Sequence, residues 1–357
     1  MSISLNDLCY LRKFGPPPRR DAIPVHPYWP RVYELVKQTA RKFGVLQDEL
    51  KFDASQFVIH AAICYPDEDM SVEFLTLLTE WHMWLWTFDD RIDNGDLKNN
   101  LTKRAKIFDD LYKVLELSNY SLTIGKPDRK IPTIKYIRDN TNNNEGKIDG
   151  NVALLEYIIQ KILALNAPIP SKNRFAKAVR EYLLINLVST RKRPENLQDF
   201  IDERLRDSAV YTCLALVEIY VLSNSKTTEL CCYFELFELN WLCNALITLS
   251  NDIFSYEKET RQEQNEYNWL LAIQKMIQDN SLESAVIIAK NMLRDYWKRF
   301  DRIGSYYKMT TKKNDPLHKY IKIMYNWVIG TAYWSMYVSL RYKSPTSPFI
   351  ELKLNNS

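Results

Sequence analysis

The chain has 357 residues, and its 48 lysines and arginines against 44 aspartates and glutamates leave a net charge of only +4. This near balance excludes nucleic acid or an anionic membrane surface as the main partner. Only 8 glycines are present, and few segments alternate apolar and polar residues. Together with frequent Leu, Ile, Lys and Glu, this composition predicts an all-α protein.

The six cysteines follow neither a metal-binding nor a disulfide pattern. They form no C-x-x-C pair, and no histidines accompany them at ligand spacing, so we expect reduced thiols in a cytoplasmic protein. The longest apolar run, 209–223, contains Glu218 and is too short to span a bilayer. We therefore expect no stable membrane insertion.

The N-terminal segment 1–30 carries six prolines, which block helix formation and favour an extended strap over the body, a candidate lid. Helical periodicity begins near Arg31. The stretch from 118 to 151 lacks it, and its Asn-rich part, about 138–150, predicts a polar surface insertion. No domain boundary is expected there, because both flanks are helical and neither half looks self-sufficient.

The rest of the chain has the periodicity of long helices joined by short polar breaks. Helices are predicted over 55–64, 70–88, 101–117, 152–166, 172–190, 194–223, 228–260, 267–277, 282–303 and 316–343. Many long helices with short connections indicate a helical bundle. The densest basic run, 191–193, is expected to be a solvated helix end.

The segment Trp81–Asp93 is an aromatic helix that ends in carboxylates, namely Asp89, Asp90 and Asp93. On a helix, Asp89 and Asp93 share a face. The carboxylates repel one another at the negative end of the helix dipole, which is unfavourable unless a cation lies against them. Mg²⁺ is the natural candidate, because it prefers oxygen ligands and is usually held by one or two carboxylates plus substrate phosphates. A solvated acidic helix end is the alternative.

A second copy of this pattern serves as an internal control. Phe108-Asp109-Asp110 repeats the opening of the acidic motif but continues to Lys113 where an acid would be required. We interpret this copy as an ordinary surface. The comparison predicts that the two copies differ in burial and in chemistry.

A second oxygen-rich face follows a long apolar helix. Asn251, Ser255 and Glu259 are spaced by four and four residues, so an amide oxygen, a hydroxyl and a carboxylate point in similar directions. Three oxygens on one face suit a hard cation. A polar helix end is the alternative, and it is weakened by the presence of the first acidic motif on a separate helix.

Two cation sites that face each other across a bundle make sense if a polyphosphate lies between them. Basic and aromatic residues should then converge on the same place. Arg204 and Asp207 are three residues apart, and Trp327, Trp334 and Arg341 recur at intervals of seven. Trp86 lies three residues before Asp89. Core packing is the alternative for each tryptophan, but the repeated order of aromatic below and charge above favours a pocket.

These residues together resemble the class I terpene synthases of the microbial, single α-domain, sesquiterpene-synthase-like type. The matching elements, in order, are Asp89-Asp90-Arg91-Ile92-Asp93, Arg204-x-x-Asp207-Ser208, the N-D-x-x-S-x-x-x-E motif from Asn251 to Glu259, and Trp334-Ser335 followed by Arg341-Tyr342. The resemblance covers about 81–342. It implies a single-domain helical bundle over 31–345 with a central active-site cavity, followed by a tail over 346–357.

The resemblance also implies roles for individual residues. Metal ligands would be Asp89, Asp90, Asp93, Asn251, Ser255 and Glu259, holding three Mg²⁺ ions, with Mn²⁺ as a substitute. The diphosphate of a prenyl diphosphate would contact Arg204, Lys258, Arg341 and Tyr342. Asp207 and Ser208 would complete the ionisation machinery, and Trp86 and Trp334 would stabilise the carbocation. The implied enzyme is a carbon–oxygen lyase that favours farnesyl diphosphate and forms a cyclic or acyclic terpene.

Two other functions stay open at this point. A prenyl chain-elongating transferase shares the fold and the first motif, but it normally carries acids where this chain has Asn251 and Ser255. A non-catalytic helical interaction protein would not need Arg204, Arg341 and Tyr342 at these positions. The expected partners are a prenyl diphosphate and no nucleic acid, and the chain is compatible with a homodimer.

Overall fold

The structure is a computed structural model. It describes residues 24–45, 48–49, 52–53, 56–93, 95–123, 148–188, 196–223, 225–230, 234–262, 267–277 and 281–339. Most of the proline-rich segment, the Asn-rich stretch 139–146, the basic run 191–193, Arg341, Tyr342 and the tail 346–357 lie outside these ranges, so the predictions made for them stay predictions.

All regular structure within the described ranges is helical, as the composition predicted. The α-helices are α1 (Trp29–Phe43), α3 (Phe57–Cys64), α4 (Val72–Asp93), α5 (Leu101–Thr123), α7 (Gly150–Ala164), α8 (Ile169–Val188), α9 (Leu197–Asp207), α10 (Val210–Leu222), α11 (Phe234–Glu257), α12 (Trp269–Met276), α13 (Leu282–Thr310) and α14 (Pro316–Tyr333). Two π-helical turns, η2 (Lys258–Gln262) and η3 (Trp334–Val338), follow α11 and α14. None of the described helices is long and apolar enough to cross a membrane.

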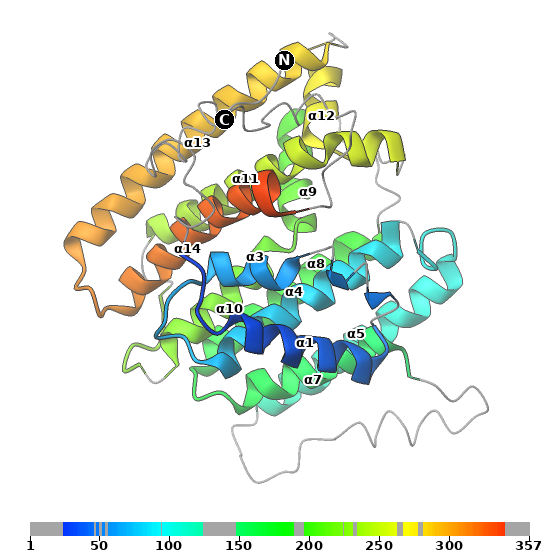
Figure 1. Ribbon diagram of the computed structural model, residues 1–357, viewed down its shortest axis with the longest axis vertical. Coiled ribbons are helices and arrows are strands. Elements are labelled where there is room, and N and C mark those ends of the chain that lie inside the picture. The colour runs from blue at the N-terminus through cyan, green and yellow to red at the C-terminus, as the bar shows by residue number, and fades with distance from the viewer. Residues whose placement is uncertain are drawn as a thin grey trace, which may run out of the picture.

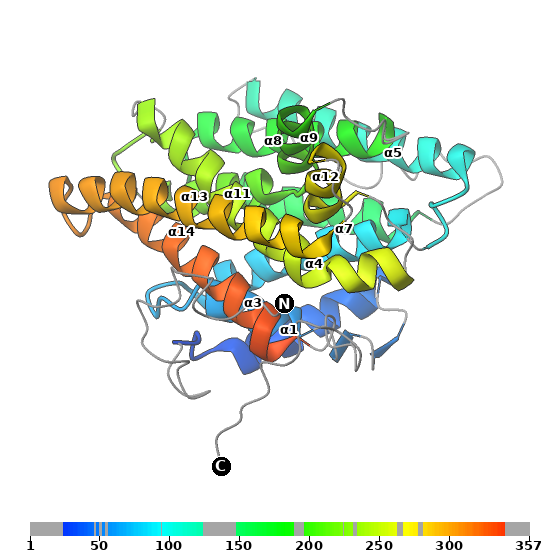
Figure 2. The ribbon, with the colours of Figure 1, turned by 90° about the horizontal axis from the view of Figure 1, so that it is seen from above.

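The helices surround two central ones, α4 and α11. Seen from above, α8 and α9 lie on one side of this pair, and α1 and α3 lie on the other (Figure 2). Helix α13 runs along one outer edge, at the opposite end of the bundle from α5 and α7 (Figure 1). Helix α4 packs against α1, α3, α7 and α10, and α11 packs against α9, α10, α12, α13 and α14.

Helix α4 is buried on most of its circumference because its sequence is apolar nearly all round. Trp81 and Trp84 stack at 5.0 Å between ring centroids, and both are fully buried. Their indole N–H groups are satisfied, since Trp81 donates to Thr212 Oγ1 at 3.0 Å and Trp84 donates to the Asn151 carbonyl at 2.8 Å. These two tryptophans are therefore core residues.

Local signals fix several helix ends. Side chains of Asp149, Asn196, Asn268, Ser281 and Asp315 accept hydrogen bonds from backbone N–H groups in the first turns of α7, α9, α12, α13 and α14, which satisfies donors that have no partner within the helix. Helix α1 ends at Gly44, whose φ of 67° suits a residue without a Cβ.

The prediction of one helix over 194–223 is wrong. Helix α9 ends at Asp207 and α10 begins at Val210, and Ala209 between them has a φ of 60°. No glycine or proline marks this break in the sequence. Tertiary contacts from Asn244 of α11 hold it instead, because Asn244 Oδ1 lies 2.9 Å from Ser208 Oγ and Asn244 Nδ2 donates to the Leu205 carbonyl at 2.8 Å.

The left-handed backbone at Ala209 makes a prediction about stability. Ala209→Val should lower the free energy of unfolding by at least about 1–2 kcal/mol, because a β-branched residue strongly disfavours positive φ. Ala209→Gly, the matched control, should leave the stability unchanged or raise it. Urea unfolding followed by circular dichroism measures both, and an equally stable valine variant would show that the break is not strained.

Candidate active site

A deep cavity lies between α4 and α11. Its volume is about 190 Å³, roughly ten times the space that one water molecule needs. The wall is built from α3, α4, α8, α9, α10, α11 and α14, together with the α9–α10 break, the turns η2 and η3, and Tyr267 before α12. Most of the residues predicted for the site line it, namely Trp86, Asp89, Asp93, Arg204, Asp207, Ser208, Asn251, Ser255, Lys258, Glu259 and Trp334.

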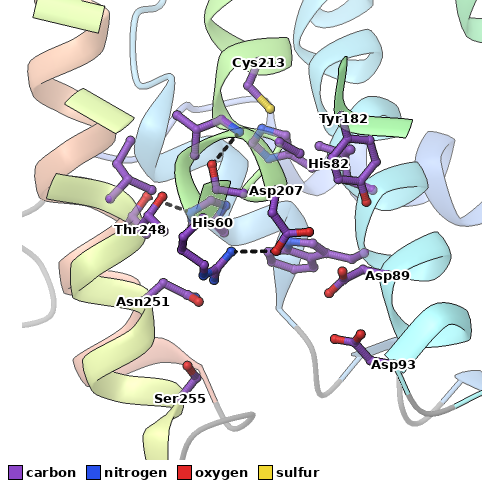
Figure 3. Close-up of a pocket in the computed structure, with 18 of the residues that line it drawn as sticks. His60, His82, Asp89, Asp93, Tyr182, Asp207, Cys213, Thr248, Asn251 and Ser255 are labelled. Atoms are coloured by element: carbon purple, nitrogen blue, oxygen red, sulfur yellow. Dashed lines mark hydrogen bonds and ion pairs between the residues drawn. The ribbon is translucent and has the colours of Figure 1, made fainter. Parts of the chain in front are cut away.

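The two oxygen-rich faces lie on opposite walls. Asp89 and Asp93 extend from α4, and Asn251 and Ser255 extend from α11 across the cavity (Figure 3). Glu259 follows in the π-helical turn after α11, where the hydrogen-bond pattern widens. The sequence predicted a common helix face, and the structure places the three residues along one wall although the helix changes type before Glu259.

Asp90 and Arg91 are not among the described residues that line the cavity. Arg91 instead pairs with Asp149, the N-cap residue of α7, at 2.8 Å, and with Asp96 in the connection after α4 at 2.9 Å. A further hydrogen bond of 2.8 Å reaches Asn151 Oδ1. This cluster fastens the end of α4 to the start of α7, and so it fixes the position from which Asp89 and Asp93 project.

Arg204 is a buried cation in the cavity wall, held by two carboxylates. Its guanidinium bonds Asp252 through two nitrogens, at 2.7 Å and 3.2 Å, and it bonds Asp207 at 3.1 Å. Burial opposes its charge, but the two carboxylates raise the pKa of Arg204 well above its ordinary value. Asp252 is fully buried and also accepts a hydrogen bond from the Trp269 backbone. The network joins α9, α11 and α12.

Glu259 sits next to this network. Burial and the Asp252 carboxylate raise the pKa of Glu259 to about 7, against the opposing effects of Arg204 and Asn268. Asn268 donates to Glu259 at 2.8 Å and to the Asp252 carbonyl at 2.8 Å. The negative charge of Glu259 is therefore under-compensated in the protein alone.

Aromatic rings form the deeper part of the cavity. The ring centroids of Trp86 and Trp334 lie 5.4 Å apart, with their planes at 33°, and Trp327 also lines the cavity. Trp334 donates its N–H to the Gln56 carbonyl at 3.1 Å. The tryptophans at 86, 327 and 334 thus belong to the pocket, while Trp81 and Trp84 belong to the core.

Comparison with known proteins identifies the group to which this site belongs. A family model described as "Terpene synthase family 2, C-terminal metal binding" matches residues 80–299, which include both acidic motifs and Arg204. The chain belongs to the terpene synthase family. Its enzymes act on prenyl diphosphates, and the metal-binding description agrees with the two oxygen-rich walls.

Individual terpene synthases match over most of the chain. Terpene synthase 1 of Acytostelium subglobosum is 24% identical over 368 residues, covering 99% of this chain and 98% of that protein. Germacrene A synthase of Nostoc punctiforme is 24% identical over 317 residues, covering 84% and 86%. A solved structure of wild-type cucumene synthase has a TM-score of 0.66 at 16% identity, covering 88% of this chain and 97% of that one; at this identity it shows a common fold.

The donor set of this terpene synthase fits a hard divalent cation. In the described part of the chain, no three carboxylate, imidazole or thiol side chains converge into a self-sufficient metal site. The facing walls offer carboxylate, amide and hydroxyl oxygens instead. Mg²⁺ suits such a site because it keeps several waters and completes its shell with substrate phosphates.

The second copy of the acidic motif, Phe108-Asp109-Asp110, lies on the surface, as the sequence predicted. The Asp109 side chain is 65% exposed and pairs with Lys113 four residues later, at 2.5 Å. Phe108 of this copy is fully buried. The sequence Phe-Asp-Asp thus occurs once at the cavity of the terpene synthase and once on its exterior.

Several lining residues were not predicted from the sequence, namely His60, His82, Leu85, Tyr182, Ala209, Val210, Cys213, Ile247, Thr248, Tyr267 and Thr331. A usable signal existed for His82. It lies four residues before Trp86 and seven before Asp89, so on a helix it shares their face. His60, Tyr182 and Thr331 come from separate helices, and no spacing in the sequence relates them.

The raised pKa of Glu259 predicts how stability changes with pH when divalent cations are absent. Between its ordinary value of 4.5 and about 7, the folded protein holds a proton that the unfolded chain has released, so this group lowers the free energy of unfolding as pH rises. Glu259→Gln removes this contribution.

The stability of the wild type should therefore decline relative to Glu259→Gln between about pH 5 and pH 7. Urea unfolding of both proteins at several pH values measures the difference, in which titrating groups remote from Glu259 cancel. Parallel stability curves would contradict the assignment of a raised pKa to Glu259.

Proposed function

We propose that the protein ionises a prenyl diphosphate in a Mg²⁺-dependent reaction, with farnesyl diphosphate as the favoured substrate. Loss of diphosphate leaves a carbocation, which rearranges and ends as a cyclic or acyclic terpene. The observation that carries this proposal is the facing pair of oxygen-rich walls above an aromatic cavity.

Three Mg²⁺ ions are proposed, with Mn²⁺ as a substitute. Asp89, assisted by Asp90 or Asp93, would hold two, and Asn251, Ser255 and Glu259 would hold the third. When bound, the ions stabilise negative charge on the departing diphosphate. The raised pKa of Glu259 supports its part, because a cation would supply the positive charge that the protein alone lacks.

Cationic side chains complete the diphosphate site. Arg204 and Lys258 line the cavity beside the metal walls and would bond the phosphate oxygens. Asp207 holds the Arg204 guanidinium at 3.1 Å, and Ser208 lies at the break between α9 and α10. Arg341 and Tyr342 are proposed as further diphosphate contacts on the resemblance alone.

The floor of the cavity suits a carbocation. Trp86 and Trp334 present aromatic faces that attract a cation without offering it a nucleophilic lone pair. The buried setting also excludes water, which would otherwise quench the cation. The choice of farnesyl diphosphate rests on the likeness to a relative named germacrene A synthase, since germacrene A is a sesquiterpene hydrocarbon.

The remaining expectations complete the proposal. We infer a single catalytic domain over 31–345, a lid function for 1–30 and an inert Asn-rich insertion. A cytoplasmic location agrees with the buried free thiols of Cys64, Cys213 and Cys243. A homodimer is compatible with these features.

The decisive experiment incubates the purified protein with geranyl, farnesyl or geranylgeranyl diphosphate, with and without Mg²⁺. We expect Mg²⁺-dependent release of diphosphate and a volatile terpene identified by mass spectrometry. Activity that requires added isopentenyl diphosphate would indicate chain elongation, and no release from any substrate would overturn the proposal.

The two Phe-Asp-Asp segments provide a matched pair. Asp89→Asn should lower the rate of diphosphate release by at least about a hundredfold, because it removes a proposed metal ligand. Asp109→Asn makes the same change on the exposed copy and should leave the rate unaltered. Both should retain the helical circular dichroism of the wild type, and equal activity of the two variants would refute the metal role of Asp89.

Arg204 combines a structural and a catalytic role, which two substitutions can separate. Arg204→Ala should lower the free energy of unfolding by about 3 kcal/mol, because it leaves the buried Asp252 carboxylate without its cation. Adding Asp252→Asn removes the stranded charge and should restore part of the stability.

Diphosphate release should stay low in the double variant, since the proposed phosphate contact is still missing. Urea unfolding and a diphosphate assay on the same preparations measure both effects. Recovery of activity together with stability would mean that Arg204 acts through the fold alone.

A further inference from the structure

Two histidines line the part of the cavity that would hold the hydrocarbon chain of the proposed substrate. An apolar lining would be expected at this place. His60 from α3 and His82 from α4 both line the cavity, and their exposed fractions are 6% and 3%. Among the described residues, neither ring nitrogen of His82 has a hydrogen-bond partner, and Nδ1 of His60 also has none. Buried polar atoms without partners are unfavourable, so their presence at this place calls for a ligand.

The neighbours of the two rings hold them in position. His82 stacks on Trp327, with centroids 6.0 Å apart and planes at 16°, and it lies 5.5 Å from His60. His60 Nε2 lies 3.1 Å from Thr331 Oγ1. His82 thus has its ring packed against other aromatic rings, while neither of its nitrogens has a hydrogen-bond partner among the described residues.

The depth of His82 places it away from the diphosphate end. Seven residues separate it from Asp89 on α4, which is roughly 10 Å along the helix. Figure 3 shows His82 on the far side of His60 from Asn251 and Ser255. A hydrocarbon chain whose diphosphate lies between the two oxygen-rich walls would reach this depth.

The environment keeps both imidazoles neutral. Burial lowers the pKa of His82 to about 4, and burial together with the neighbouring His82 lowers the pKa of His60 well below its ordinary value. A neutral imidazole carries one nitrogen lone pair, whichever tautomer is present. By contrast, burial raises the pKa of the Cys213 thiol, which lines the same region, to about 12, so it stays protonated.

We propose that His82 is the base that ends the reaction, by removing a proton from a carbon next to the cationic centre. This inference rests on the proposed function. The C–H electron pair becomes the new C=C double bond, the carbocation is neutralised, and the proton bonds to the free ring nitrogen. When the product departs, this proton is transferred from the imidazolium to water or to the released diphosphate.

The low basicity of His82 does not obstruct this step. A carbocation is a far stronger acid than imidazolium, even when the pKa of the imidazolium is depressed, so the transfer runs downhill. The low basicity has a use instead, because the imidazole is unprotonated when the substrate binds. A charged imidazolium at this depth would repel the carbocation.

The main test replaces His82 by Phe, which keeps a flat ring against Trp327 and removes both nitrogens. Diphosphate release should stay within about threefold of the wild type, since the ionisation groups are unchanged. The share of the main wild-type hydrocarbon should fall at least roughly tenfold in favour of other products. Tyr65→Phe is the control: Tyr65 is buried beside His82, with ring centroids 5.9 Å apart, but is not among the residues that line the cavity, so the product profile should not change.

A second variant separates basicity from shape. His82→Ala opens a space that added imidazole can fill, and imidazole should restore the wild-type hydrocarbon. Pyrrole has nearly the same shape but no basic lone pair, so it should not restore it. Restoration by both compounds would show that only the shape of the ring matters, and it would overturn the inference.

Further outcomes separate this inference from the proposed function. If the wild type releases diphosphate and His82→Phe yields the same products, the inference alone fails. It also fails if His60→Phe changes the products while His82→Phe does not. Incorporation of ¹⁸O from labelled water into the wild-type product, lost in His82→Phe, would show that the nitrogens hold a water instead. A wild type that releases no diphosphate would overturn both proposals.

Discussion

The pairing of Arg204 with the buried carboxylate of Asp252 is the interaction on which the rest of the site depends. Neither charge would be tolerated in this place without the other. Because Arg204 belongs to α9 and Asp252 to α11, the pair fixes the distance between two walls of the cavity. It also surrounds Glu259 with charge, so the position and the protonation of the second oxygen-rich wall are set by one network. The first wall has its own anchor, Arg91, which holds the end of α4 to α7.

Helix α4 shows how one helix serves core and cavity together. Trp81 and Trp84 face inwards, where their N–H groups find partners in neighbouring helices. His82, Trp86, Asp89 and Asp93 share another face and line the cavity. Since both faces are fixed by the same backbone, any rotation that exposed the carboxylates differently would also break the tryptophan packing. The rigidity of the core is therefore what makes the position of the carboxylates reproducible.

Much of this arrangement was readable in the sequence, because it depends on period and spacing. Helical periodicity gave the all-α bundle, and the spacing of Asp89 and Asp93 gave a shared face. Two features were not readable. The break at Ala209 depends on Asn244 from another helix, and His60 meets His82 and Thr331 only through the packing of α3, α4 and α14. Each is a tertiary effect, which residue type and spacing do not encode locally.

The two π-helical turns have a consequence for how such a bundle can vary. Lys258–Gln262 and Trp334–Val338 both directly follow long helices that line the cavity. A π turn accommodates one extra residue within a helix while the flanking helix keeps its direction. Insertion or deletion of a single residue in η2 would rotate Glu259 around the helix axis. The same change in η3 would rotate Ser335 and the residues after it. The contour of the cavity wall can thus be changed by chain length alone, and the packed helices behind it need not move.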